Sequence, residues 1–317
     1  MRTRSVAALS IAALSAALLA GCSSASPDAS PSASDASGDI CASAVPSGSV
    51  SDAVEVEGTV GEPATATFTA PLDITSAERT VLVEGDGDEI ASGDLVNYGV
   101  TIFDASTGEQ AAVEGYDPEI LPVPVSVGSG ADQFFGCATV GSRIVMALPP
   151  TQSASAAVWV LDVLGTSPAA AWGEEQDPVD GFPTVELADD GAPAITVPDG
   201  EDPPTETEIA VLKKGDGATV NSGDNVIVQY TGVLWSDGTV FDSSWESGTP
   251  AQFATTGVVP GFQKALEGQT VGSQVLVVIP PAEGYGDTAQ GEIPAGSTLV
   301  FVIDILAAQA PTATAPQ

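Results

Sequence analysis

The sequence predicts an α+β fold in which a mainly antiparallel sheet wraps on one short helix, and it predicts two tandem copies of this fold. Short apolar and β-branched runs such as "DNVIVQYTGVLW", "SQVLVVIPP" and "TLVFVIDIL" are separated by Gly, Asp and Pro turns, which is typical of strands. Only "VPGFQKALEGQ" has the pattern of a helix. Blocks of sequence also recur in the same order in both halves of the 317-residue chain.

The amino-terminal segment has the pattern of an export signal. Arg2 and Arg4 precede an apolar run from Val6 to Ala20, which is too short for a stable membrane span. The run ends in "LLAGC", which resembles a bacterial lipobox, where cleavage precedes the cysteine and the cysteine carries the lipid. We therefore expect a signal peptide over residues 1–21 and a lipid on Cys22 that anchors the protein to the extracytoplasmic face of the cell membrane. The alternative is ordinary secretion, with Cys22 a chance thiol.

The next segment, residues 22–40, consists almost entirely of Ser, Ala, Pro, Asp and Gly, so we expect a flexible tether. Two cysteines then remain, Cys41 and Cys137. An even pair in an exported protein favours a disulfide, and buried free thiols are the alternative.

Four pairs of blocks define the tandem copies. "GDGDEIASGD" and "GEPATATF" match "GDGATVNSGD" and "GAPAITVP" at an offset of 130 (215 minus 85 for the first pair). "TVGSRIVMALPP" matches "TVGSQVLVVIPP" at 131 (270 minus 139), and "AVWVLDVL" matches "LVFVIDIL" at 142 (299 minus 157). We expect one copy over residues 41–170, a linker over 171–179, a second copy over 180–309 and a flexible tail over 310–317.

The second copy gives the clearest local patterns. Val226, Val228 and Tyr230 alternate with Asn225, Ile227 and Gln229, a period of two that predicts a half-buried strand. In the helical segment, Phe262 and Leu266 belong to one short apolar face, which ends before Gly268. We expect Trp235 and Trp245 at the surface or on the rim of a site, and the alternative is that one of them touches the substrate.

Charge and composition exclude many functions. The chain has 43 acidic and 7 basic residues, so its formal charge is −36, which argues against nucleic-acid binding and suits the solubility of an exported protein. There is no histidine, which removes Ser-His-Asp and Cys-His catalysis and histidine metal sites. The acidic run Glu84–Glu89 lacks the spacing of a calcium loop. We expect no metal and no cofactor.

From about Asp224 to Leu306 the chain resembles the FKBP-type peptidyl-prolyl cis-trans isomerases. The resemblance rests on "VQYTGVLWSDGTVFDSS", "VVPGFQKALEGQTVGSQVLVVIPPAEGYG" and "IPAGSTLVFVIDIL", in register throughout. It implies two tandem FKBP-like domains, each a curved antiparallel sheet wrapped on one short helix, with an apolar pocket between sheet and helix. It also implies catalysis of cis/trans isomerisation at X-Pro bonds, which a dry aromatic pocket accelerates by penalising the twisted amide less than the planar one.

The resemblance carries specific roles to this sequence. It implies catalytic roles for Tyr230, Asp242, Phe262, Tyr285 and Ile293: Phe262 is the pocket floor, Asp242 lies near the substrate carbonyl, Tyr285 donates its hydroxyl to a backbone carbonyl of the peptide, and the Ile293 N–H donates to the ligand. It implies a substrate-binding wall made of Phe241, Phe253, Val258, Val259 and Phe301. Taken singly, the strand aromatics also fit a core, and Asp242 also fits a turn.

Two features qualify the resemblance. Ala251 stands where many members carry an aromatic, and the loop after Tyr285 is shorter, with Gln290 or Gly291 replacing a frequent histidine or aromatic. The first copy lacks the loop altogether and places Val100, Ala131 and Trp159 at the positions of Tyr230, Phe262 and Phe301. We therefore interpret it as a degenerate FKBP-like domain that does not catalyse.

Taken together, the sequence predicts a monomeric, membrane-tethered isomerase of proline-containing unfolded or exported polypeptides, with macrolides as candidate inhibitors. The alternative is a chaperone or ligand-binding module on the same fold with little turnover.

Overall fold

The computed structural model describes residues 39–116, 120–198 and 200–311. The expected signal peptide, the lipidation site at Cys22 and nearly all of the expected tether lie outside the described residues, as do residues 312–317 of the expected tail. No helix among the described residues is both long enough and apolar enough to span a membrane.

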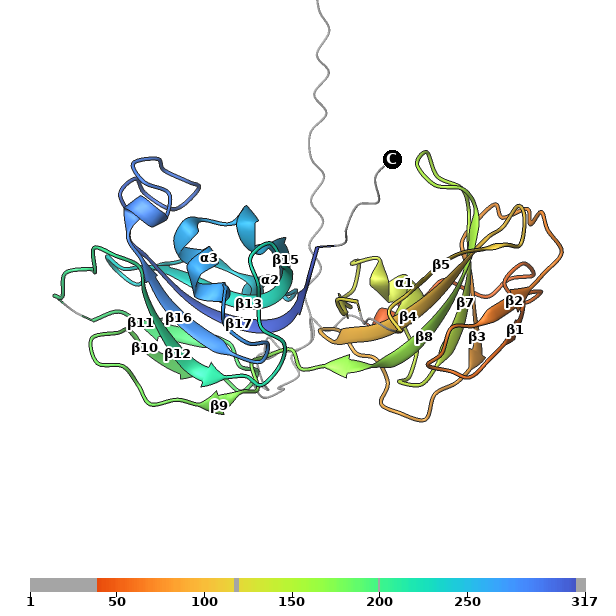
Figure 1. Cartoon of the computed structure of the whole chain (residues 1–317), viewed down its shortest axis with the longest axis horizontal. Coiled ribbons are helices and arrows are strands. Elements are labelled where there is room, and N and C mark those ends of the chain that lie inside the picture. Colours follow the sequence, from red (N-terminus) through yellow and green to blue (C-terminus); the bar gives the residue numbers. More distant parts are fainter. Residues whose placement is uncertain (1–38, 117–119, 199, 312–317) are drawn as a thin grey trace, which may run out of the picture. The chain divides into compact units, whose positions relative to one another are not determined.

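The described chain is α+β, with two large antiparallel sheets, two two-stranded sheets and a few short helices (Figure 1). The first sheet has the strand order β3-β7-β8-β4-β5, and β6 pairs with β4. Its elements are η1 (Ile40–Ser43), β3 (Glu78–Val83), β4 (Leu95–Asp104), β5 (Gln110–Glu114), β6 (Val123–Pro124), α1 (Ala131–Phe135), β7 (Arg143–Leu148) and β8 (Ala157–Ser167).

The second sheet has the order β14-β13-β17-β16-β12-β9, and β15 pairs with β13. Its strands are β9 (Glu174–Glu175), β12 (Glu208–Lys214), β13 (Asn225–Leu234), β14 (Val240–Ser243), β15 (Ala251–Ala254), β16 (Gln274–Ile279) and β17 (Leu299–Gln309). Its helices are α2 (Ser244–Ser247), η2 (Thr255–Gly257), α3 (Pro260–Leu266) and η3 (Pro281–Glu283).

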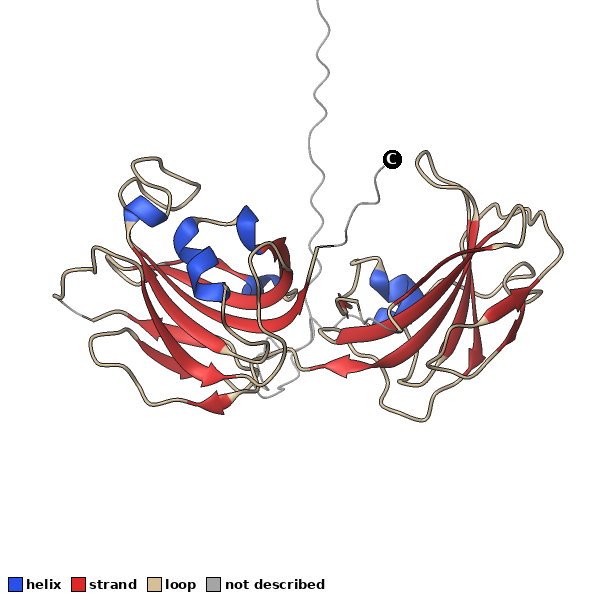
Figure 2. Ribbon diagram, viewed as in Figure 1, coloured by secondary structure: helices blue, strands red, loops and turns tan. Residues whose placement is uncertain are grey.

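Each sheet is covered on both faces. Figure 2 shows a short helix against one face of each curved sheet, α1 in the first and α3 in the second. A two-stranded hairpin packs on the other face: β1 (Glu55–Glu57) with β2 (Thr65–Thr67) in the first, and β10 (Thr184–Leu187) with β11 (Pro193–Thr196) in the second. In β17, Phe301, Ile303 and Ile305 face the helix-side core, whereas Val300 and Val302 face the hairpin.

This second layer corrects one prediction. We expected the Asn225–Tyr230 stretch to be half-buried, but β13 is buried over most of its length. Val226 and Val228 pack in the helix-side core, and Val233 packs in the cluster that contains the hairpin residues Val185 and Ile195. A strand covered on both faces is more continuously apolar than an alternating pattern suggests.

Two other expectations were incomplete. The helical pattern was expected only at "VPGFQKALEGQ", yet α1 and α2 are also helical, each no more than five residues long. One turn is too short to show a periodic apolar face. Part of the expected linker also belongs to the second sheet, because β9 pairs with β12 and the Ala171 N–H donates to Asp304 Oδ2 at 2.8 Å.

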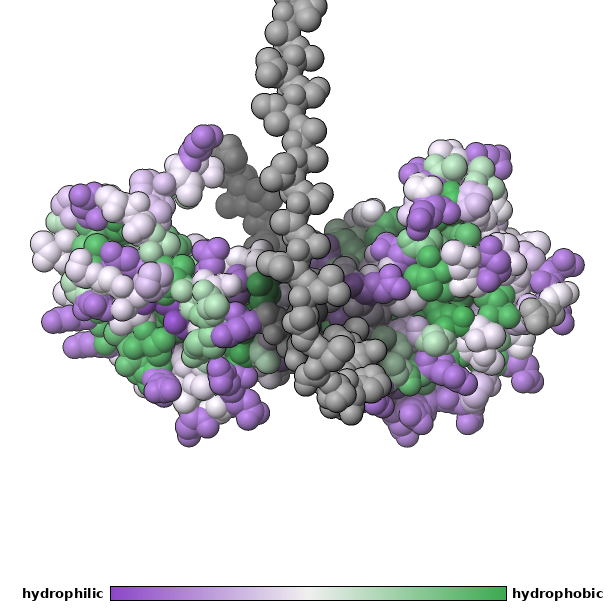
Figure 3. All heavy atoms as spheres, turned by 180° about the vertical axis from the view of Figure 1, so that it is seen from behind, coloured by the Kyte–Doolittle hydropathy of each residue, from purple (hydrophilic) through white to green (hydrophobic). Residues whose placement is uncertain are grey.

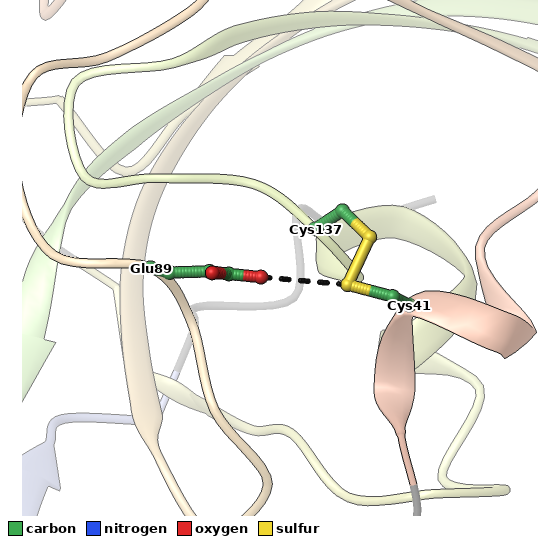
Figure 4. Close-up of side chains that lie close together, drawn as sticks. All are labelled: Cys41, Glu89 and Cys137. Atoms are coloured by element: carbon green, nitrogen blue, oxygen red, sulfur yellow. Dashed lines mark hydrogen bonds between the residues drawn. A yellow bond between two sulfur atoms is a disulfide. The ribbon is translucent and has the colours of Figure 1, made fainter.

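Cys41 and Cys137 form a disulfide with their Cα atoms 4.8 Å apart, which ties η1 to the residue that follows α1 by two positions (Figure 4). A Glu89 carboxylate oxygen lies 3.5 Å from Cys41 Sγ. A disulfide sulfur carries no proton, so this approach is a contact rather than a hydrogen bond. The disulfide also leaves no thiolate to bind a metal ion, although Cys41, Glu89 and Cys137 lie close together.

Hydrophilic side chains are spread across the surface seen in Figure 3, including its projecting loops. This matches a chain whose formal net charge is −36.

Candidate active site

A cavity of about 650 Å³ lies between the helix-side face of the second sheet and α3. It is lined by Tyr230, Phe241, Asp242, Phe253, Gly257, Val258, Val259, Phe262, Tyr285, Gln290, Gly291, Glu292, Ile293 and Phe301. All ten side chains that the sequence indicated as site residues are among them. The sequence reasoning did not assign a role to Gly257, Gln290, Gly291 or Glu292, which come from loops without a strand or helix pattern.

Aromatic rings form the floor and walls of this cavity. Phe262, only 5% exposed, has its ring centroid 5.0 Å from that of Phe301, at an interplanar angle of 86°. Phe253 and Tyr230 contact the same Phe262 ring edge-on, with centroids 5.6 and 6.1 Å away. Edge-to-face packing is the preferred geometry of aromatic pairs, so the rings hold one another in place.

Two glycines allow this close packing. A Cβ on Gly232 would lie 2.6 Å from Phe241 Cζ and 2.7 Å from Phe301 Cε1, so only glycine leaves room for both rings. A Cβ on Gly261 would lie 2.4 Å from Ile279 Cγ2, so this glycine lets α3 approach β16. Pro260 is the first residue of α3, a position whose missing N–H costs the helix nothing.

One polar pair lies in the aromatic wall. The Tyr230 hydroxyl donates to Asp242 Oδ2 at 2.5 Å. Tyr230 is on β13 and Asp242 on β14, where Asp242 pairs with Gly232 next to a bulge. Burial, followed by the hydrogen bond and the charge of Asp242, raises the pKa of Tyr230 well above its usual value. Tyr230 therefore remains a protonated hydrogen-bond donor that fixes the carboxylate.

Tyr285 lies at the mouth of the cavity, between Gly284 and Gly286, and is 38% exposed. Gly286 has φ 59°, which favours glycine, and the Gly296 N–H donates to its carbonyl at 2.8 Å to close the loop. Among the described residues, no group accepts from the Tyr285 hydroxyl and no aromatic ring packs on its ring. The hydroxyl is thus available to a ligand.

The Ile293 N–H, which the resemblance assigned to ligand binding, has an acceptor within the protein in this structure. That N–H donates to the Gln290 carbonyl at 2.8 Å, within a small bridge whose return bond is 2.9 Å. Ile293 contributes its buried side chain to the cavity instead. The Val259 N–H, in contrast, has no acceptor within the described part of the chain. Val259 precedes a proline at a helix start, where backbone N–H groups lack intrahelical partners, and this signal could have identified it.

The two tryptophans expected at the surface or rim do not line the cavity. Trp235 is buried with Val233 and Leu276 on the hairpin side, and its Nε1 donates to the Glu201 carbonyl at 3.3 Å. Trp245 is half-buried on α2.

Comparison with known proteins gives this region a family. The family model described as FKBP-type peptidyl-prolyl cis-trans isomerase matches residues 217–306. A probable FK506-binding protein of Corynebacterium glutamicum is 38% identical over 116 residues, which cover 37% of this chain and 98% of that protein. An FK506-binding protein of Streptomyces anulatus is 39% identical over 119 residues, covering 36% of this chain and 95% of that protein. The crystal structure of FkpA from Escherichia coli matches with 30% identity and a TM-score of 0.32, over 42% of this chain and 53% of the FkpA chain.

Proposed function

Because this chain belongs to the FKBP-type peptidyl-prolyl cis-trans isomerase family and is an isomerase, we propose that it catalyses X-Pro isomerisation in exported proteins outside the cytoplasm, held at the membrane by a lipid on Cys22. The observation that carries the proposal is the cavity lined by aromatic rings, with Tyr230 bonded to Asp242 and an unpartnered Tyr285 hydroxyl, among the described residues, at its mouth.

The chemistry follows from amide resonance. Rotation about a peptide bond faces a barrier of about 18–20 kcal/mol because the C–N bond has partial double-bond character. Water stabilises the planar, charge-separated amide by hydrogen bonding to its carbonyl, and the aromatic cavity excludes that water. The twisted amide is thereby penalised less than the planar one. This mechanism needs no nucleophile and no proton transfer, so it suits a chain without histidine.

Each polar group has a role in this proposal. Phe262 supports the proline ring, and the Tyr285 hydroxyl donates to a backbone carbonyl of the peptide. The Asp242 carboxylate, oriented by Tyr230, lies near the carbonyl that precedes the proline. The Val259 N–H takes the donor role that the sequence had assigned to Ile293.

The extracytoplasmic setting is supported by the amino-terminal sequence and by the disulfide. Arg2 and Arg4, the apolar run and "LLAGC" form a lipoprotein-type export signal. The Cys41–Cys137 disulfide suits an oxidising compartment.

A tandem duplication is supported by the two strand orders. β3-β7-β8-β4-β5 and β12-β16-β17-β13-β14 follow one scheme, each with a helix on one face and a hairpin on the other. Three bulges also coincide at the offset of 130, including Asn97/Tyr98 with Ile227/Val228 and Ile102/Phe103 with Gly232/Val233. We infer that the first copy is a degenerate, non-catalytic FKBP-like domain, because Ala131 stands at the position of Phe262 and the Tyr285 loop is missing.

One observation favours a binding role for the first copy. A cavity of about 450 Å³ is lined mainly by its apolar side chains, among them Ala131, Phe134, Phe135, Trp159 and Leu161. Its lining has no counterpart of the Tyr230–Asp242 pair. Such a cavity is suited to holding an apolar segment of a client polypeptide without turnover.

The test uses the full chain in an isomerisation assay with a short X-Pro peptide. We expect acceleration that is lost in the Phe262→Ala variant and reduced in the Tyr285→Phe variant, together with competition by FK506. A wild-type protein that binds FK506 but accelerates nothing would favour the binding-module alternative.

The other parts of the proposal need separate tests. Replacement of Cys22 by Ser should abolish lipid labelling and release the protein from membranes without changing peptide turnover. Filling the first cavity by Ala131→Trp should slow refolding of a protein client but leave turnover of the short peptide unchanged. Equal refolding by both proteins would make the first copy a scaffold only.

A further inference from the structure

An ion pair joins the two segments that carry the floor and the mouth of the active-site cavity. Lys264 Nζ on α3 lies 2.8 Å from Glu283 Oε1 and 2.7 Å from Glu283 Oε2 on η3. The Thr207 hydroxyl donates to the same Oε2 at 2.6 Å. The Glu283 carboxylate therefore accepts three hydrogen bonds, and these bonds lower its pKa, with the bond from Lys264 the largest cause.

The pair lies close in sequence to both substrate-facing side chains. Lys264 follows Phe262 by two residues, and Glu283 precedes Tyr285 by two residues. Phe262 belongs to a helix and Tyr285 to a loop, so their separation is not fixed by any shared element. The Lys264–Glu283 contact is a direct link between those two segments.

The side chain of Tyr285 has no polar partner and no aromatic partner among the described residues, and glycines flank it on both sides. Its position is therefore set by backbone contacts. The Thr288 N–H donates to the Tyr285 carbonyl at 3.2 Å, and η3 leads directly into Tyr285. The Gly286 N–H bonds to the Pro281 carbonyl at 2.8 Å, so the turn around Tyr285 follows η3 when η3 moves.

The scarcity of basic residues in the second half of the chain makes the Lys264–Glu283 pair specific. Lys264 is the only basic residue from Gly215 to the end of the chain, in a protein with 43 acidic residues. Of all the carboxylates in that stretch, the described structure places only Glu283 in an ion pair with it.

We propose that Lys264 and Glu283 are positioning residues that hold Tyr285 at the mouth of the cavity and thereby set the affinity for the peptide. The inference rests on the proposed role of Tyr285. A hydroxyl that bonds the peptide equally in the ground and twisted states contributes to binding more than to the chemical step, so its misplacement raises KM and leaves kcat nearly unchanged.

The experiment measures kcat and KM of the full chain and of the Glu283→Gln and Lys264→Met variants with an X-Pro peptide. Exposed ion pairs have modest effects, and these side chains are 27% and 55% exposed, so we expect KM to rise roughly two- to fivefold. The kcat value should stay within about twofold of wild type. Raising the salt concentration to about 1 M should bring the wild-type KM toward that of the variants, whose KM should be less sensitive to salt.

Two controls separate positioning from a structural effect. Lys214→Met removes an exposed lysine from the end of β12, away from the loop, and should leave KM unchanged. The double charge reversal of Lys264→Glu with Glu283→Lys should restore KM to within about twofold of wild type, because it rebuilds the pair.

A double-mutant cycle decides the claim. In a Tyr285→Phe background, Glu283→Gln should have little further effect on KM, because the hydroxyl it positions is gone. An undiminished effect of Glu283→Gln in that background would overturn the proposal, as would a Glu283→Gln variant with wild-type KM. A wild-type chain without turnover would instead contradict the proposed function.

Discussion

The helix-side faces of the two sheets differ in what occupies equivalent register positions. In the second sheet Phe301 pairs with Gly232 and Val277, whereas in the first Trp159 pairs with Ile102 and Met146. Gly232 leaves space that two aromatic rings occupy, whereas Ile102 carries a side chain at the equivalent register position. The same curved sheet on a short helix therefore forms around two different cavity linings.

The two sheets also anchor their polar interiors differently. Arg143 and Asp162, paired across β7 and β8, form a buried ion pair with side chains 3% and 0% exposed. Arg143 also donates to the carbonyls of Gly58, Thr59 and Glu62, which join β1 to β2. At the same register in the second sheet, the neutral Gln274 donates to Asp304 at 2.8 Å. The hairpin of the first sheet is therefore held by a buried ion pair in addition to apolar contacts, and the hairpin of the second packs mainly through apolar contacts.

The largest expected effect is at Phe262. Phe262→Ala should destabilise the second sheet and helix by about 3–5 kcal/mol and remove the cavity floor, so kcat/KM should fall steeply. Phe135→Ala is the matched change in the first sheet, since Phe135 is also buried on a helix. This variant should lower the stability of the first sheet by a similar amount. The protein that remains folded should keep the wild-type kcat/KM. Equal losses of activity in both variants would contradict the division of roles between the two sheets.

The next effect is at Arg143. Arg143→Met leaves the Asp162 carboxylate buried without its cation, so unfolding by denaturant should show a loss of about 3–5 kcal/mol in the first sheet. Gln274→Met removes a hydrogen bond to Asp304 and should cost only about 1–3 kcal/mol. Isomerase activity of the folded Arg143→Met protein should match wild type. If Gln274→Met lowered the free energy of unfolding more than Arg143→Met, the inference that the first sheet depends more on its buried polar pair would be wrong.

A smaller effect is expected when the second sheet is made more like the first at one position. Gly232→Ala adds a Cβ that would overlap Phe241 and Phe301, at a cost of about 1–3 kcal/mol for overpacking. The rings must shift into the cavity, so KM for an X-Pro peptide should rise. The reverse change, Ile102→Gly, should destabilise the first sheet and leave the kcat/KM of the folded chain unchanged. Unchanged KM in Gly232→Ala would show that the rings are freer than their packing implies.

The smallest effect concerns Tyr230. Its pKa is raised in the folded protein. The hydrogen bond that it donates as a protonated phenol is therefore fully present below the ordinary tyrosine pKa of about 10. That bond is lost only as the pH rises through the higher pKa of the folded state. The contribution of Tyr230 to kcat/KM should therefore stay constant between about pH 7 and 10. Tyr230→Phe should lower the free energy of unfolding by roughly 0.5–1.5 kcal/mol, because it removes the hydrogen bond to Asp242. Tyrosinate absorbance, wild type minus Tyr230→Phe, should show no ionisation of Tyr230 near pH 10, and a normal titration there would refute this.

Most of the cavity lining follows from the resemblance to the FKBP family. The strand-like runs and the one helical segment placed the chain in register with that family, and the resemblance, position by position, then indicated the ten residues that line the cavity. The absence of histidine and the scarcity of basic residues narrow the chemistry that such a chain can support. The missing Tyr285 loop in the first half is the sequence difference behind the proposal that the second half carries the activity.

The partners of backbone groups and of distant side chains depend instead on the tertiary structure. The Ile293 N–H bonds to Gln290, the Val259 N–H stays free within the described residues, and Lys264 meets Glu283. The hairpins that cover the second face of each sheet also could not be inferred, since a short apolar run does not reveal which face of which strand it will contact. Folding brings together chain segments that are far apart in sequence. Their contacts determine the hydrogen-bond acceptors, the ion-pair partners and the second layer of each core. The sequence therefore indicates which side chains line the cavity, and the fold determines which of their polar groups remain free to act.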